Sequence, residues 1–256
     1  MKKYIFILFI FILLQESCHN EKEQDLSFPV SKYIEMGVPD CNRVWKDYDF
    51  LKTINTLGEI KTKYPFSLPR YQSEKSGKLF EHLISMKNLS FLNSDTISLS
   101  DKAYMIQKFI GIQTDFCQTY TDLYSYKQYY NKELIQFYMF GITIAQKMLD
   151  LAYQINASGN PADQQIKSGF PAIRYIYLTV MSYTLEKEKN VSIYDKKDLE
   201  ILSDSVSVSL QKNMNWFDSH AASLLQRKMA EVVDSTSSVR IRRRYRKIMG
   251  LLEDRK

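Results

Sequence analysis

A run of apolar residues at steps of three and four between residues 99 and 123 constrains this chain most strongly. In a helix with 3.6 residues per turn, such a run lies on one face, which must be covered by another element. Ser98, with Asp101 three residues later, matches an N-terminal capping pattern. The sequence therefore predicts a long amphipathic helix here. The residues of its apolar face are Met105, Phe109, Ile112, Phe116, Tyr120 and Leu123.

Similar patterns predict helices along most of the chain. Residues 134–155 are apolar nearly all the way round, so we expect a central helix surrounded by neighbours. The segment 199–210 alternates like a strand but also fits a helical face, and we interpret it as a helix because helical patterns flank it. In the first helix, the predicted buried face is Val44, Tyr48, Leu51, Ile54 and Leu57. The remaining predicted helices span residues 40–63, 74–87, 172–187, 215–233 and 239–256.

The scarcity of glycine and proline also favours helices. The chain contains only eight Gly and six Pro, too few for the many tight turns of a β-sandwich or barrel. We therefore predict an all-α fold, an irregular bundle of about seven or eight helices, that forms a single domain over residues 29–256. The turn-forming residues 156–161 mark a hinge if two subdomains exist.

The N-terminus has the composition of an export signal. Lys2 and Lys3 precede an apolar run at residues 4–14, and Ser17 stands directly before Cys18. A run of this length is too short to span a bilayer comfortably. The pattern resembles the signal peptide of bacterial lipoproteins of the Bacteroidota type. A cleaved secretory signal without lipid attachment is the alternative.

The resemblance covers only this region, and it implies where the mature chain resides. It implies that residues 1–17 are a signal peptide and that Cys18 carries the lipid, whose two or three acyl chains suffice for stable anchoring. The polar residues 18–28 then form a flexible tether. The expected location is the cell envelope, on the outer membrane, at its periplasmic face or at the cell surface.

Two surfaces are candidates for contact with a partner. One is a tyrosine-rich stretch and the other is a basic amphipathic helix near the C-terminus, suited to anionic lipid headgroups or an acidic protein. Helix packing of the tyrosines and simple solvation of the basic helix are the alternatives. The candidate residues are Tyr120, Tyr124, Tyr126, Tyr129 and Tyr130 in the first surface, and Arg242, Arg243, Arg244, Arg246 and Lys247 in the second.

The net charge does not indicate a nucleic-acid partner. Loss of Lys2, Lys3 and Glu16 with the signal peptide lowers the formal net charge from +6 to +5. This surplus is mild for a chain of this length.

The two cysteines that remain besides Cys18 have two interpretations. In an exported chain, Cys41 and Cys117 could form a disulfide that encloses most of the N-terminal half. Buried free thiols are the alternative.

No catalytic or metal-binding pattern emerges from the sequence. The chain lacks a glycine-rich phosphate loop and the zinc and serine-hydrolase motifs. His82 stands beside Glu81, and His220 is two residues from Asp218, spacings at which helical side chains diverge. We therefore predict no cofactor, no metal site and no catalytic residue. The abundant carboxylates leave a paired-acid hydrolase as an alternative.

These observations together predict a lipid-anchored envelope protein that acts as a non-catalytic protein-binding or scaffolding module. One alternative is an immunity lipoprotein that neutralises a toxin delivered to the envelope. The other is a carboxylate-dependent hydrolase.

Overall fold

A computed structural model describes residues 28–121, 129–159, 169–190 and 192–253. This part of the chain contains nine α-helices, two short 3-10 helices and no strand, which confirms the all-α prediction. The helices are α2 (Val30–Glu35), α3 (Asp47–Lys63), α4 (Gly77–Leu83), η1 (Met86–Asn93), α5 (Leu99–Tyr120), α6 (Asn131–Ala157), α8 (Phe170–Glu188), α9 (Lys196–Asn213), η3 (Met214–Trp216), α10 (Ser219–Ser235) and α11 (Val239–Glu253).

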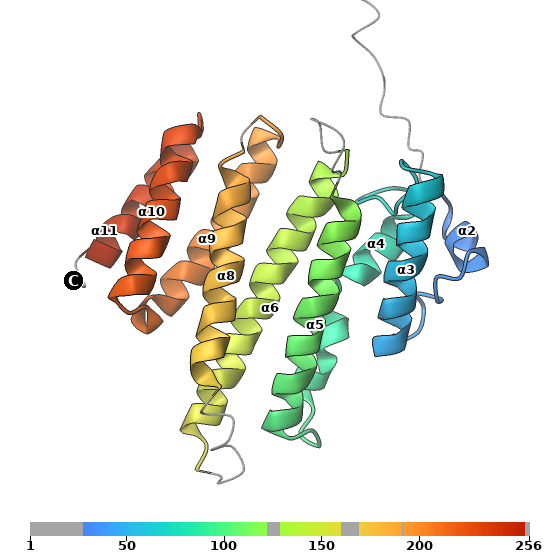
Figure 1. The fold of residues 1–256 in the computed structure, drawn as a ribbon, viewed down its shortest axis with the longest axis horizontal. Helices are drawn as coiled ribbons and strands as arrows, with labels where there is room; N and C mark the ends of the chain where they lie inside the picture. The colour runs from blue at the N-terminus through green and yellow to red at the C-terminus, as the bar shows by residue number, and fades with distance from the viewer. Residues whose placement is uncertain (1–27, 122–128, 160–168, 191, 254–256) are drawn as a thin grey trace, which may run out of the picture.

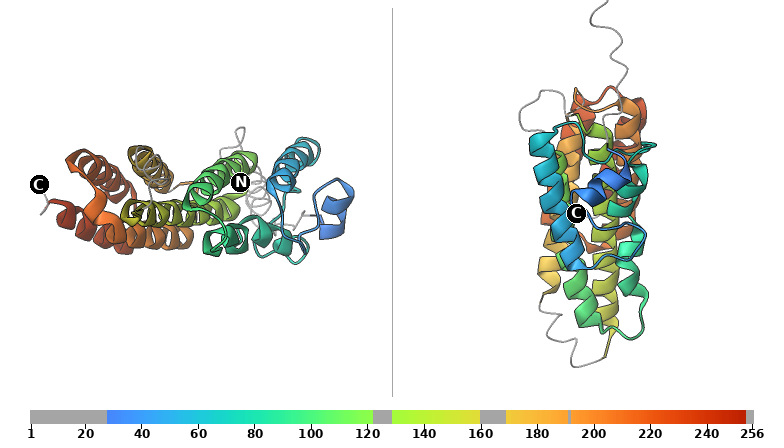
Figure 2. Two further views of the ribbon diagram at one scale, coloured as in Figure 1. Left: turned by 90° about the horizontal axis from the view of Figure 1, so that it is seen from below. Right: turned by 90° about the vertical axis from the view of Figure 1, so that its right-hand side faces the viewer.

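The helices are arranged in two layers that extend from α2 at one end to α11 at the other (Figure 1). Figure 2 shows α3, α5, α8 and α10 in one layer, which we call the front layer, and α4, α6, α9 and α11 in the back layer. Each hairpin of consecutive helices pairs one layer with the other, as in α5 with α6 and α10 with α11. Stacked helix pairs of this kind produce elongated arrays.

Helix α5 confirms the long amphipathic helix that was predicted from the sequence. The Ser98 side chain accepts a hydrogen bond from the backbone N–H of Asp101 at 3.1 Å and caps the helix. Phe109, Ile112 and Phe116 are buried as expected, whereas Met105 is only half-buried. A single helical face is thus covered over most of its length.

Helix α6 is the centre of the fold. It packs against α5, α8 and α9 and buries side chains on nearly all sides, as predicted for residues 134–155. Gln146, Lys147 and Asp150 interrupt its apolar surface. Over the described ranges, no helix combines the length and the hydropathy that a membrane crossing requires.

The predicted face of the first long helix is only partly right: Leu57 is fully buried and Ile54 is partly buried, but the N-terminal part of the face is wrong. Val44, Tyr48 and Leu51 are 78%, 73% and 51% exposed, and the buried face instead includes Phe50. Two apolar faces compete on this helix, and the face with Phe50 wins because its ring packs edge-on against Phe109 of α5 at 5.3 Å between centroids.

The start of this helix also differs from the prediction. It begins at Asp47 instead of residue 40, because residues 40–46 form a loop with its own hydrogen bonds. The Trp45 indole N–H donates to the Asp40 carbonyl at 2.9 Å. The Asp49 carboxylate then accepts from the backbone N–H of Lys46 and from the Arg43 guanidinium, which fixes the first turn.

The other boundaries follow the sequence with small shifts. Helix α9 confirms the helical interpretation of residues 199–210. The predicted helix 74–87 is divided into α4 and η1. Asp218 caps α10 by accepting from the backbone N–H of Ala221, so α10 starts later than predicted. Helix α6 ends at Ala157, and the hinge predicted at 156–161 falls partly outside the described residues.

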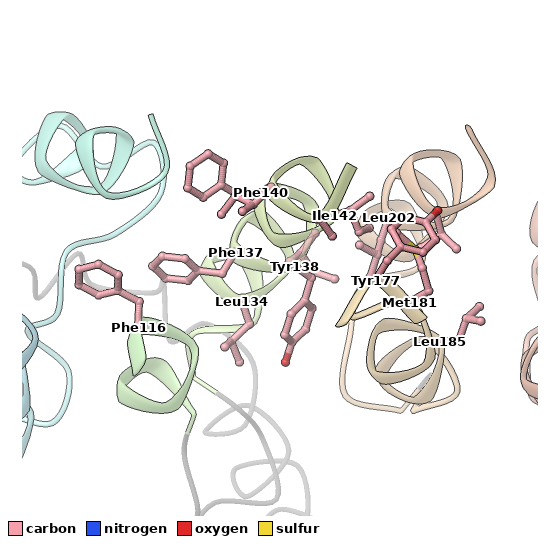
Figure 3. Packing of buried hydrophobic residues seen from close by; sticks show 14 of the residues in the cluster. Phe116, Leu134, Phe137, Tyr138, Phe140, Ile142, Tyr177, Met181, Leu185 and Leu202 are labelled. Atoms are coloured by element: carbon pink, nitrogen blue, oxygen red, sulfur yellow. The ribbon is translucent and has the colours of Figure 1, made fainter. Parts of the chain in front are cut away.

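An aromatic cluster connects α5 with α6 in the core. Phe137 of α6 is fully buried, and its ring stacks on Phe116 of α5 at 5.9 Å between centroids. The rings of Phe80 and Tyr120 lie at 5.2 and 5.0 Å from it. Figure 3 shows Phe116 and Phe137 facing each other. Met181 and Leu185 of α8 belong to the same hydrophobic core.

Candidate functional site

The tyrosine-rich stretch does not form the predicted contact surface where it is described. Tyr120 and Tyr130 are buried; their hydroxyls donate to the carbonyls of Pro69 and Pro65 at 2.8 and 2.7 Å. Their hydroxyls can be buried without loss of hydrogen bonding, because each one donates to a carbonyl of the proline-containing loop. Tyr129 is half-buried and packs against Phe66 at 4.6 Å between ring centroids. The other two residues of that prediction, Tyr124 and Tyr126, lie outside the described residues.

The basic helix is present as α11, but part of its charge is used within the fold. Arg244 forms an ion pair with Asp204 of α9, and its guanidinium donates to the Ser203 hydroxyl at 2.7 Å. Arg240 binds the same aspartate at 2.9 Å. Arg242 donates to the Ser237 carbonyl at 3.4 Å. Arg244 is therefore a structural residue and not part of a free contact surface.

Three cations of α11 remain exposed. Arg243, Arg246 and Lys247 project from the helix, and within the described part of the chain none of them forms an ion pair. We call these three residues the α11 basic patch. The opposite face of α11 is buried against its neighbours, as the sequence predicted, through Ile241, Tyr245, Ile248 and Leu252.

Cys41 and Cys117 are free thiols, so the disulfide that the sequence left open is not formed, and both side chains are partly buried. Cys41 lies in the loop before α3 and Cys117 on α5. Their surroundings differ: the charges that act on Cys41 are Asp40 and Lys78, whereas Cys117 lies beside Gln113 and is influenced by the charge of Lys187. Burial raises the pKa of both thiols, that of Cys117 to about 12.

We expect Cys117 to resist alkylation while the protein is folded. Only the thiolate reacts, and a pKa of about 12 leaves roughly a thousandfold less thiolate at neutral pH than an ordinary cysteine has. Peptide mass spectrometry after iodoacetamide treatment should show Cys117 modified at least 100-fold more slowly than in guanidinium, where the unfolded chain is the control. A peptide in which Cys41 is bonded to Cys117 would contradict this account.

The histidines are placed as packing and surface residues. His82 lies edge-on to Trp45 at 4.4 Å between ring centroids; burial lowers its pKa, so the ring stays neutral. His220 is exposed at the start of α10, while Asp218 caps that helix and pairs with Arg174 at 3.7 Å. Among the residues described, no three or more His, Cys, Asp and Glu side chains are grouped to hold a metal ion.

Two buried carboxylates were missed by the sequence analysis. Glu133 accepts from the Arg70 guanidinium at 3.1 Å and from the backbone N–H of Tyr71 at 2.7 Å. Glu188, at the end of α8, accepts from the Tyr245 hydroxyl at 2.5 Å, and burial raises its pKa to about 8. Both acids join helices or loops, and neither lines the groove described next.

A groove in the front layer was also missed. Helix α3 packs on α5, and α8 packs on α10, but α5 and α8 barely touch and are joined through α6 behind them. Along this α5/α8 groove lie two cavities of about 250 and 300 Å³. Figure 3 shows Tyr138 projecting from α6 into the space between the two front helices. The groove has only a weak signal in the local sequence, because it forms where two helices do not pack on each other.

The chain matches no family model, no curated protein and no solved structure. The placement of its own residues is therefore the basis for any functional conclusion.

Proposed function

We propose that this chain is a lipid-anchored protein of the cell envelope and acts as a non-catalytic binding module. The charged, apolar and small residues that precede Cys18 support the anchor, which would hold the protein on the outer membrane. A protein partner then binds to the folded body.

The α11 basic patch carries this proposal. Helix α11 is at the end of the two-layer array (Figure 1), so its outer face is not covered by another described helix. A terminal helix of such an array needs a polar outer face for solubility, but uncharged or mixed residues would serve that purpose. Three exposed cations that form no ion pair within the described part of the chain instead favour an acidic surface on the partner, since complementary charge accelerates and orients association.

The positions of the buried acids support binding over hydrolysis. A hydrolase that uses two carboxylates needs them to converge in a cavity that admits the substrate. Of the described residues that line the two cavities of the α5/α8 groove, none is Asp or Glu. Glu133 and Glu188 each use one carboxylate oxygen in contacts within the fold. The other oxygen of each is buried and has no hydrogen-bond partner among the described residues.

We expect charge reversal of the α11 basic patch to remove the partner. The triple variant Arg243→Glu, Arg246→Glu and Lys247→Glu would repel an acidic surface and should reduce recovery of the partner by about tenfold or more. The measurement is cross-linking in intact cells, followed by affinity capture of the full-length protein and quantitative mass spectrometry.

A second triple variant provides the control. Lys147, Lys196 and Lys197 are exposed on α6 and α9, and their reversal to Glu changes the net charge by the same amount. Recovery should be unchanged in this variant. Equal losses in both triple variants would indicate a general effect of charge, and no loss in either would show that α11 is not the contact surface.

A further inference from the structure

The described walls of the α5/α8 groove are uncharged. Charged residues make up 25% of the chain, yet among the described residues that line either cavity none is Asp, Glu, Lys or Arg. Lys187 lies beside the second cavity, with its Nζ 4.8 Å from the centroid of the Tyr183 ring, but a charged group placed between the apolar walls would lose its hydration, which is unfavourable. The groove therefore selects an uncharged occupant.

The threonines of the second cavity make its walls more apolar than their composition suggests. Thr114 and Thr121 of α5 donate to carbonyls of their own helix at 3.0 and 2.8 Å. Thr179 and Thr184 of α8 do the same at 2.9 and 2.8 Å. With each hydroxyl bonded to the carbonyl four residues earlier, the methyl groups are the part of these side chains left for apolar contact.

The two cavities lie along continuous rows of residues. On α5 the lining residues follow one another at steps of one and three from Ala103 to Thr121, and the same helical faces of α6 and α8 run through both cavities. At 1.5 Å per residue this stretch of α5 is roughly 27 Å long. A partner helix of that length, with a diameter of about 10 Å, occupies on the order of 2,000 Å³, far more than the cavities contain. A slender linear molecule fits this shape.

The groove also offers space at Gly141 of α6 and a buried hydrogen-bond acceptor on Gln113 of α5. A Cβ atom added at Gly141 of α6, which lines the second cavity, would meet no atom within 4 Å. Gln113, only 6% exposed, donates through Nε2 to the Phe137 carbonyl at 2.7 Å, which fixes the orientation of its amide. Its buried Oε1 has no donor in the described part of the chain.

We propose that the α5/α8 groove binds the aliphatic chain of an uncharged single-chain lipid, and that a hydroxyl of this lipid donates to Oε1 of Gln113. The chain lies along the rows of α5, α6 and α8 and replaces water on their apolar side chains. This site is separate from the α11 basic patch and does not depend on it.

Chain length provides the first test. Burial of each methylene should strengthen binding about fourfold, so monodecanoylglycerol should bind roughly 15-fold more tightly than monooctanoylglycerol. Methyl NMR spectra of the full-length protein should show shifts at Thr114, Ile144 and Val180. Decanoate, which carries a charge, should bind at least tenfold more weakly. Equal affinities for the three ligands, or shifts elsewhere only, would overturn the proposal.

A glycine substitution provides the second test. Gly141→Phe should fill the floor of the groove and weaken monodecanoylglycerol binding more than tenfold. Gly58→Phe on α3 is the matched control, because a Cβ atom there also meets nothing within 4 Å and Gly58 is outside the groove; its affinity should be unchanged. Undiminished binding by a folded Gly141→Phe protein would overturn the proposal. If that variant does not fold, the chain-length series on the unaltered protein still decides.

An experiment with phosphatidylcholine vesicles tests whether the bound aliphatic chain comes from a free single-chain lipid or from a bilayer. The proposal predicts that the free monoglyceride binds and that vesicles leave the three methyl signals unshifted. If only the vesicles shift these signals, the assignment to a single-chain lipid is wrong.

Discussion

Replacement of Phe137 by alanine should lower the free energy of unfolding by about 3–5 kcal/mol, the range for a large aromatic side chain removed from a packed core. Phe137 is fully buried in the N-terminal part of α6 and contacts three rings that belong to α4 and α5, so no single neighbour can move to close the cavity. Urea unfolding followed by circular dichroism measures the change.

The control for this substitution is Tyr48→Ala on α3. Tyr48 is 73% exposed, so its removal should change the unfolding free energy by about 0.5 kcal/mol or less. A large loss at Tyr48 together with a small loss at Phe137 would mean that the apolar faces of α3 and α6 are assigned wrongly.

The unfolding free energy should fall as pH rises through neutrality because of Glu188. Burial raises the pKa of this carboxyl from about 4.5 to about 8, so the folded chain keeps a proton that the unfolded chain has already released. Its stabilising contribution is complete below about pH 4.5 and is lost as pH approaches about 8, with a slope of up to about 1.4 kcal/mol per pH unit between. Arg244 favours the charged form and reduces the rise in pKa.

Glu188→Gln removes this titration and should flatten the stability profile between about pH 5 and 8. Glu186 on the same helix is the matched control. Its carboxylate binds Lys189 and Lys228, which lowers its pKa to about 2, so it titrates below this window in both the folded and the unfolded chain. Glu186→Gln should keep the original slope. Parallel profiles for Glu188→Gln and the unaltered protein would contradict the buried-acid assignment.

Local periodicity was sufficient to predict the long helices but not to choose between two faces. In α5 and α6 only one arrangement buries the large side chains, and the structure follows it. On α3, Tyr48 and Phe50 lie on different faces, of which the first is exposed and the second is buried. The buried face of α3 is set by contact with Phe109, which is distant in the sequence, so a local pattern cannot predict it.

The functional surfaces depend even more on contacts between distant segments. A tyrosine has the same amphipathic side chain whether it is buried or exposed, so Tyr120 and Tyr130 could not be assigned without the carbonyls they bind. Arg244 resembled its neighbours in the sequence until Asp204 of α9 was placed beside it. The α5/α8 groove exists because two helices do not pack on each other. No sequence motif indicates such a lack of contact.

Site-specific photo-cross-linking from α11 in intact cells tests the proposed binding function most directly. A photoreactive residue at Arg246 should form a defined adduct with one partner, and the same residue at Lys197 on α9 should not. The charge changes Arg243→Glu and Lys247→Glu should abolish the adduct. Identical adducts from both positions, or no adduct from Arg246, would contradict the proposal that this protein works by binding a partner through α11.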